Sequence, residues 1–364
     1  MTMSIASVSS NYLTSSLLPS IQQTEATLAS DGVAMSTGQY ADIGTQLGDQ
    51  SGYELSLRNE SELMQSLTAS NSIVTENLTT AQDALDSLRT SASTAQSDLT
   101  AWTSESTSSN STLESIGSTG LSSLVSAANT TSNGSYVFGG ENDSVAPMAD
   151  STTVTAAVST AFQNYFGFSI GSASASGVTV SQMQGFLIGP LNDLFTTNWT
   201  SGTAATSGPP ATAAIPALSV ASSTNTTTQI APGETGTAST NANQAGFQQL
   251  AEGYAMLAVF GNTGLTSSVQ QTVASSAMSL ITEGTSSITS QEADVGTSLA
   301  TVSDASSSMA SQMTILQTQI GNLDNVNTTT VATEITQLST QLQTAYNLTA
   351  QIQKLSLAQY LPVS

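Results

Sequence analysis

Hydrophobic residues recur every seven positions along a stretch in the first third of the chain. Residues 53–116 contain no Gly or Pro. Six heptads with two apolar positions each predict a long helix that packs lengthwise on other long helices. The first series is Leu57, Met64, Asn71, Leu78, Leu85, Ala92 and Leu99, and the second is Leu67, Val74, Ala81, Leu88, Ala95 and Trp102. The polar Asn71 in the first series can fix the register of such a packing.

The same period returns near the C-terminus and predicts a second long helix. Its positions are Val295, Val302, Met309, Leu316 and Leu323, with Leu299, Met313 and Ile320 offset by four. A break is expected at 321–327, where Asn327 or Thr328 can cap the next helix. That last helix carries Val331, Leu338, Ala345 and Ile352, joined by Ile335 and Leu342, and apolar Leu355, Leu357, Tyr360 and Leu361 follow.

The N-terminal segment is also helical in pattern. Ile5, Val8 and Tyr12 fall three and four apart, and Ile21, Leu28 and Met35 fall seven apart. Because Pro19 lacks a backbone N–H, it should begin or kink a helix. The pattern predicts a short helical segment, a helix over 19–36 that Gly38 ends, and a loop over 39–56.

The middle of the chain has a different character. A helix over 112–132 should stop at Asn133-Gly134, and a short strand is expected at 136–138. Helices near 154–166 and 181–195 are plausible in the Phe-rich and Pro-rich part, and residues 200–228 have the composition of a mobile surface loop.

These patterns predict a mainly α protein. Both chain termini build a long antiparallel bundle of heptad helices, and a central mixed α/β or β-rich domain is inserted into it. The predicted segments are 1–38 (N-terminal axial helix), 39–145 (first half of the bundle), 146–245 (inserted outer domain), 246–326 (second half of the bundle) and 327–364 (C-terminal axial helix).

Composition excludes several kinds of chemistry. The 364 residues include 25 acidic and 3 basic side chains, and the net charge of −22 disfavours nucleic acid and anionic membranes as partners. Cys and His are absent, so thiol and imidazole catalysis, disulfides and Cys-ligated metals are excluded. The only lysine, Lys354, does not lie in a phosphate-binding loop. No catalytic residue, cofactor or metal ligand is therefore expected.

Neither a membrane span nor a secretion signal is predicted. No stretch reaches the roughly 18 consecutive apolar residues of a spanning helix. Residues 1–16 lack the basic and apolar regions of a cleaved signal peptide.

Several segments, in order, resemble the hook-associated proteins of the hook–filament junction in the bacterial flagellum, within the flagellin superfamily. Residues 128–140, with sequence ANTTSNGSYVFGG, are similar to the run that closes the N-terminal half of those proteins. Ser36-Thr37-Gly38 resembles the end of their first helix, and residues 346–361 resemble their terminal helix. Gln39 departs from the Lys or Arg that commonly follows the Ser-Thr-Gly.

The resemblance implies a secreted structural protein of the flagellum that takes part in motility. Its partners would be copies of itself, hook and filament subunits, the flagellar type III export apparatus and an export chaperone. It implies export without a cleaved signal and terminal helices that form coiled coils along the filament axis, with the central domain facing outward.

The heptad stripes supply the candidate assembly and core residues, because a single hairpin cannot bury all their apolar faces. The N-terminal assembly set is Ile5, Val8, Tyr12, Ile21, Leu28 and Met35. The bundle-core set is Leu57, Met64, Leu67, Val74, Leu78, Leu85, Leu88, Leu99, Val302, Met309, Leu316 and Leu323. The C-terminal assembly set is Val331, Ile335, Leu338, Leu342, Ile352, Leu355, Leu357 and Tyr360.

Three alternatives remain open from the sequence. The chain could be the filament flagellin itself, which shares the helical ends. It could be a surface adhesin, with Trp199, Tyr165 and Phe166 stacking on sugars. A hydrolase would need a pair of carboxylates, as in Glu141/Asp143 or Glu292/Asp294. The second pair lies on the predicted second long helix, where side chains at i and i+2 point apart.

Overall fold

The computed structural model describes residues 10–104, 110–207 and 212–358; for 10–16 and 355–358 it describes the backbone alone. The chain forms two compact units. The first contains residues from the two ends, 1–65 and 311–364, and the second contains residues 66–310. Most of the described chain is helical, as the heptad patterns predict. The five segment boundaries expected from the sequence stay predictions.

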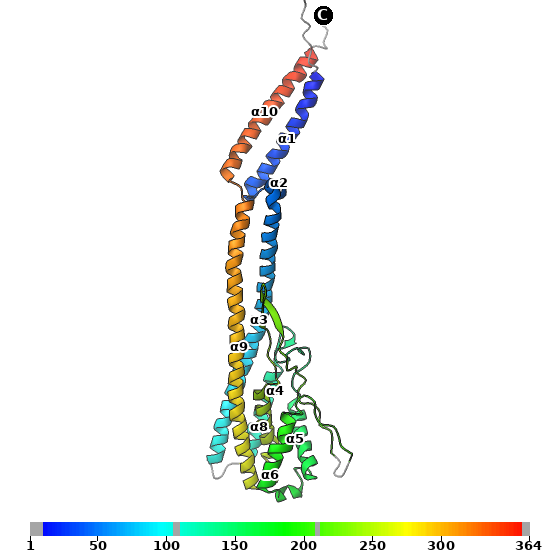
Figure 1. The fold of residues 1–364 in the computed structure, drawn as a ribbon, viewed down its shortest axis with the longest axis vertical. Helices are drawn as coiled ribbons and strands as arrows, with labels where there is room; N and C mark the ends of the chain where they lie inside the picture. Colours follow the sequence, from blue (N-terminus) through cyan, green and yellow to red (C-terminus); the bar gives the residue numbers. More distant parts are fainter. Residues whose placement is uncertain (1–9, 105–109, 208–211, 359–364) are drawn as a thin grey trace, which may run out of the picture. The chain divides into compact units, whose positions relative to one another are not determined.

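The first unit is built from helices of both chain ends. They are α1 (Ser10–Thr37), α2 (Ile43–Leu47), a short 3-10 helix (Gly48–Gln50) and α10 (Thr328–Ala358). The beginning of α3 (Ser51–Ser104) and the end of α9 (Ser267–Asp324) complete it. The helices α1 and α10 lie side by side (Figure 1).

Two expectations for the N-terminal segment are wrong. The helix expected over 19–36 does not begin at Pro19, because α1 runs through this residue from Ser10 to Thr37. The Pro19 ring is exposed, so the helix continues with the loss of one backbone hydrogen bond. The expected loop over 39–56 is mostly helical, because the Asp42 carboxylate caps α2 by accepting from the Thr45 N–H at 3.0 Å.

The break before the last helix is shorter than the predicted 321–327. The helix α9 continues to Asp324, and α10 begins at Thr328. The cap itself is confirmed: Asn327 Oδ1 accepts from the backbone N–H groups of Thr329 at 3.0 Å and Thr330 at 3.3 Å.

The second unit packs the remaining helices around one core. It contains most of α3 and α9, together with α4 (Asn110–Ala128), α5 (Ser151–Phe166) and α8 (Ala245–Phe260). The helices expected near 154–166 and 181–195 are present, the second as α6 (Val180–Phe186), a π-helix (Leu187–Leu191) and α7 (Asn192–Phe195). A 3-10 helix (Ala173–Gly177) precedes α6.

Two small hairpins supply the β-structure. Strands β1 (Thr131–Ser132) and β2 (Ser135–Tyr136) pair antiparallel, as do β3 (Thr227–Ala231) and β4 (Glu234–Thr237). The helix expected over 112–132 ends at Ala128, because Asn133 (φ 51°) and Gly134 (φ 85°) form the turn of the first hairpin. The predicted strand at 136–138 is therefore wrong beyond Tyr136.

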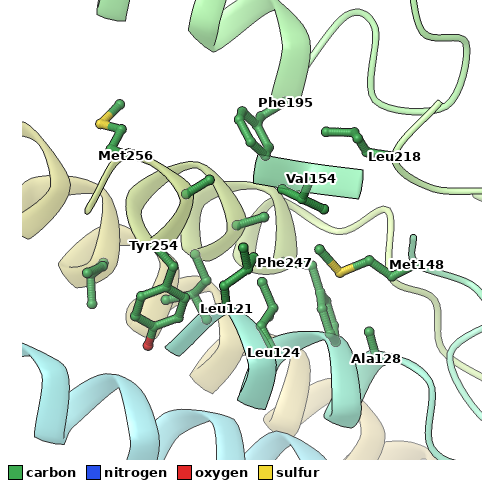
Figure 2. Close-up of a cluster of buried hydrophobic side chains, with 14 of the residues drawn as sticks. Leu121, Leu124, Ala128, Met148, Val154, Phe195, Leu218, Phe247, Tyr254 and Met256 are labelled. Atoms are coloured by element: carbon green, nitrogen blue, oxygen red, sulfur yellow. The ribbon is translucent and has the colours of Figure 1, made fainter. Parts of the chain in front are cut away.

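The core of the second unit lies between α4 and α8. Figure 2 shows Leu121 and Leu124 of α4 facing Phe247 of α8 within a larger group of buried apolar side chains. The two helices approach closely at Gly117, where an added Cβ atom would lie 2.2 Å from the backbone nitrogen of Ala258. This close approach lets α8 be hydrophobic nearly all round and still be covered.

Candidate assembly surface

The helices α1 and α10 form an antiparallel pair that hydrogen bonds join at one end and near its middle. At one end the linkers on either side of the pair hydrogen-bond to each other, with Tyr40 N donating to Asp324 O and Val326 N donating to Gly38 O, both at 2.9 Å. Further along, the Tyr346 hydroxyl donates to the Glu25 carboxylate, which raises the pKa of Tyr346. The pair is thus fixed in register by contacts between residues from opposite ends of the chain.

This pair buries little of its apolar surface. Among the described side chains of α1 and α10, the buried hydrophobic ones are Ile21, Ala34 and Val331. The other predicted positions are half-buried, namely Leu28, Ile335, Leu338, Leu342 and Ile352, and Met35 is exposed. Leu18, Val33, Tyr346 and Leu348 are exposed by 46–56%. The pair therefore presents apolar side chains that its own unit leaves uncovered.

Some predicted assembly residues have no described side chain. Ile5, Val8 and Tyr360 lie outside the described residues. Tyr12 lies in α1, and Leu355 and Leu357 lie in α10, each described by its backbone. Their part in the surface stays a prediction.

The bundle-core positions are far better covered. Leu57, Met64 and Leu316 are buried in the first unit, and Val74, Leu78, Leu85, Leu88, Leu99, Val302 and Met309 are buried in the second. Leu67 and Leu323 are half-buried. The contrast with α1 and α10 shows that the heptad stripes of the long helices are satisfied within the chain, whereas those of the terminal helices are not.

Asn71 has a specific partner in the core of the second unit. It is 1% exposed, and its Nδ2 group donates to the backbone oxygen of Ile230 at 2.8 Å and to Ser306 Oγ at 3.0 Å. One polar side chain thus ties α3 to both α9 and strand β3. This contact fits the register role expected of a polar residue in a heptad series.

Both arginines are used in ion pairs between α3 and α9. In the first unit, Arg58 pairs with Glu54 and with Asp324, whose carboxylate is fully buried. In the second unit, Arg89 pairs with Asp86 and, at 3.3 Å, with Glu292. The neighbouring carboxylates raise the pKa of each guanidinium. The third basic residue, Lys354, is exposed on α10.

Two of the residues considered for a sugar platform or a carboxylate pair have other contacts in the described structure. Trp199 is 1% exposed, and its Nε1 group donates to Asn243 Oδ1 at 2.9 Å, so its ring is unavailable to a sugar. Glu292 pairs with Arg89 instead of facing Asp294. Among the described residues, no group of three acidic side chains is close enough to hold a metal ion.

The exposed apolar positions Leu18, Val33 and Leu348 fall outside the seven-residue series and were missed in the sequence. A second apolar stripe on these helices would have indicated them, because a helix that contacts neighbours on more than one side carries more than one such stripe. Within residues 10–104, 110–207 and 212–358, no helix combines the length and apolar character that a membrane crossing requires.

Comparisons with known proteins identify the class of this fold. Residues 8–143 match the bacterial flagellin N-terminal helical region, and residues 278–361 match the bacterial flagellin C-terminal helical region. The chain belongs to the flagellin family, whose members are structural subunits of the bacterial flagellum.

Among solved structures, a proposed flagellar hook-associated protein from Vibrio parahaemolyticus is similar to the chain at 11% identity. The similarity covers 77% of this chain and 99% of that one, with a TM-score of 0.49. No curated protein sequence matches the chain significantly.

Proposed function

We propose that this protein is a hook-associated subunit that joins the flagellar hook to the filament by coiled-coil assembly of its terminal helices. The observation that carries this proposal is the incomplete burial of the α1–α10 pair. Exposed Leu18, Val33, Tyr346 and Leu348 flank heptad positions that are only half-buried. Neighbouring subunits would cover these side chains in the assembled structure.

The energetics favour assembly over a stable isolated pair. At ~25 cal/mol per Å² of apolar area, an interface of ~2,000 Å² has a gross favourable free energy of tens of kcal/mol. Association and the ordering of side chains consume most of that gain. Contacts repeated with several neighbours are therefore needed for a stable structure.

The distribution of charge also favours association of copies through α1 and α10. The described part of α1 carries Glu25 and Asp31, and α10 carries Glu334 and Lys354. Most of the acidic residues lie elsewhere in the chain. Because like charges repel at short range, copies can approach through α1 and α10 at a smaller electrostatic cost than through the rest of the chain.

One feature favours a junction subunit over the filament flagellin, which is the alternative. The run over 128–140 resembles that of junction proteins, and its residues have defined positions in the fold. Asn129 exchanges two hydrogen bonds of 2.9 Å with the backbone of Met148. Phe138 packs on Phe247 with ring centroids 5.1 Å apart. We propose that 146–245 faces outward and that the flagellar type III apparatus exports the chain without a cleaved signal, aided by a chaperone.

Negative-stain microscopy of the purified protein, alone and with isolated flagellar hooks, tests the proposal. Addition to hook ends without long filaments from the protein alone supports the junction assignment. Long filaments formed by the protein alone identify it as the filament flagellin. Variants lacking 1–36 or 331–364 should keep a folded core and fail to add to hooks, and unchanged addition by either one contradicts the role of the terminal helices.

A further inference from the structure

A groove of about 390 Å³ lies in the second unit. One wall is formed by Tyr165 of α5 and by Pro190 in the π-helix. The other wall is formed by residues within 203–206 and 212–215, which pair where Thr203 and Ile215 exchange backbone hydrogen bonds of 2.8 and 3.0 Å. π-Helical turns are frequent at functional sites.

Hydrogen bonds hold the walls of this groove in place. Asn164 of α5 accepts from the backbone N–H of Ala213 at 2.9 Å and donates to the backbone oxygen of the same residue at 3.0 Å, so the second wall is tied to the helix. Asn198 N donates to Asp193 O at 2.8 Å, which brings these two residues together at the groove. The groove is therefore formed before any ligand binds, which lowers the cost of binding.

The chemistry of the lining combines an aromatic ring with neutral and acidic polar groups. Tyr165 is 47% exposed, and its ring is fixed by contacts with Phe166 and Phe186 at centroid distances of 4.8 and 5.6 Å. Around it stand the exposed carboxylate of Asp193 and the half-buried amide of Asn198. A carboxylate accepts hydrogen bonds, and an amide both donates and accepts them.

We propose that this groove binds a neutral oligosaccharide. The Tyr165 ring supplies a flat apolar surface for the C–H face of a sugar ring. Asp193 and Asn198 supply the hydrogen-bonding partners for its hydroxyl groups. The groove lining includes no Lys or Arg, so a phosphorylated or acidic glycan would lack a counterion and meet the Asp193 carboxylate.

The inference is independent of the proposed assembly. It also differs from the platform that the sequence suggested, because Tyr165 contributes to the groove whereas Trp199 is buried in the core. A failure to bind sugar would leave the hook-association experiment untouched.

Titration calorimetry of the full chain with three neutral probes, maltohexaose, cellohexaose and mannohexaose, tests the proposal, and trigalacturonic acid serves as the anionic probe. At least one neutral probe should bind. Tyr165→Ala and Asp193→Asn should each raise the Kd of that probe about tenfold or more. Asp193→Asn keeps the shape of an exposed side chain, so the test stands even where Tyr165→Ala misfolds. Circular dichroism checks the fold of each variant.

Matched controls lie outside the groove. Tyr53→Ala removes another exposed tyrosine, and Asp294→Asn neutralises another exposed carboxylate; both should leave the Kd unchanged. The proposal is overturned by absence of binding to all three neutral probes. It is equally overturned by equal binding of trigalacturonic acid, or by unchanged affinity in a folded Asp193→Asn variant.

Discussion

Arg58 and Asp324, 266 positions apart in the sequence, form an ion pair in which the guanidinium donates to a fully buried carboxylate. The backbone oxygen of Asp324 also accepts from Tyr40 N at 2.9 Å. One aspartate at the end of α9 thus contacts both α3 and the linker that follows α1. These contacts fix the place where the terminal helix pair begins within the first unit.

Replacing Arg58 should therefore destabilise the contacts among α3, the end of α9 and the linker that follows α1. In Arg58→Ala the Asp324 carboxylate stays buried without its cation, and loss of one partner of a buried pair costs about 3–5 kcal/mol. Because the Arg58 side chain is 42% exposed, we expect Arg58→Ala to lower the free energy of unfolding by a smaller amount, about 2 kcal/mol. Hydrogen-exchange mass spectrometry of peptides covering 38–60 and 315–330 should show faster exchange.

Arg89→Ala is the matched control for that variant. Its partners Asp86 and Glu292 are 54% and 22% exposed, so water can replace the lost contacts. Exchange in the second unit should change by less than in the Arg58→Ala case. An equal or larger effect of Arg89→Ala contradicts the importance assigned to the buried Asp324.

The buried Glu252 should make the second unit less stable as the pH rises. The side chain is 2% exposed, and burial raises its pKa to about 7 from the ordinary 4.5, with Asn192 Nδ2 donating to it at 3.2 Å and Glu283 nearby. The folded state holds a proton that the unfolded state has lost. Stability therefore falls between pH 4.5 and pH 7, by about 3 kcal/mol in total.

Glu252→Gln should remove this dependence. The variant should melt at a higher temperature than the parent protein at pH 8 and near the same temperature at pH 4.5. Asp294→Asn, on an exposed carboxylate of α9, serves as the control and should follow the parent curve. A parent-like pH profile in Glu252→Gln counts against a protonated, buried Glu252.

Two glycine-to-alanine substitutions should have opposite effects on the stability of the protein. At Gly117, an added Cβ atom would meet the α8 backbone at 2.2 Å, so Gly117→Ala must separate α4 from α8. We expect a loss of about 1–3 kcal/mol or more from this overpacking. At Gly32 in α1, an added Cβ atom has nothing within 4 Å, and Gly32→Ala should stabilise the helix by about 0.5–1 kcal/mol. Thermal unfolding of both variants checks the difference, and destabilisation by Gly32→Ala would show that α1 has a neighbour on that face.

Assembly should persist or improve as NaCl rises from 50 to 500 mM. Each copy carries a net charge of −22, and added salt screens the repulsion between copies while apolar contacts remain. Light scattering of the protein mixed with isolated hooks measures the effect. Loss of assembly in moderate salt would instead indicate that ion pairs between subunits dominate the interface.

The heptad repeats predicted the long helices well because the positions of the first series, from Leu57 to Leu99, are buried along α3. Other features depend on contacts that the period does not encode. Asn133-Gly134 follows a helix closely enough to read as its stop, yet it turns a hairpin. The hydrogen bond from Trp199 to Asn243 could not be predicted either, because the two residues lie 44 positions apart in the sequence.

The candidate assembly surface was predicted only in part for the same kind of reason. A seven-residue series finds the stripe that two helices share, so it found Ile21 and Val331, which are buried. It does not find Leu18 or Val33, which lie off that stripe and are exposed within the chain. Whether an apolar side chain of α1 or α10 is exposed depends on the register of the pair, and the heptad period alone does not encode that register.

The most direct test of the account is the addition of a charge to the uncovered apolar positions of the α1–α10 pair. Val33→Glu and Leu348→Glu are compared with Ser30→Glu and Gln343→Glu, which place the same charge on exposed polar positions of the same helices. Co-sedimentation with isolated hooks should fall at least tenfold for the first two variants and little for the controls. Equal co-sedimentation of all four variants would contradict assembly through this surface.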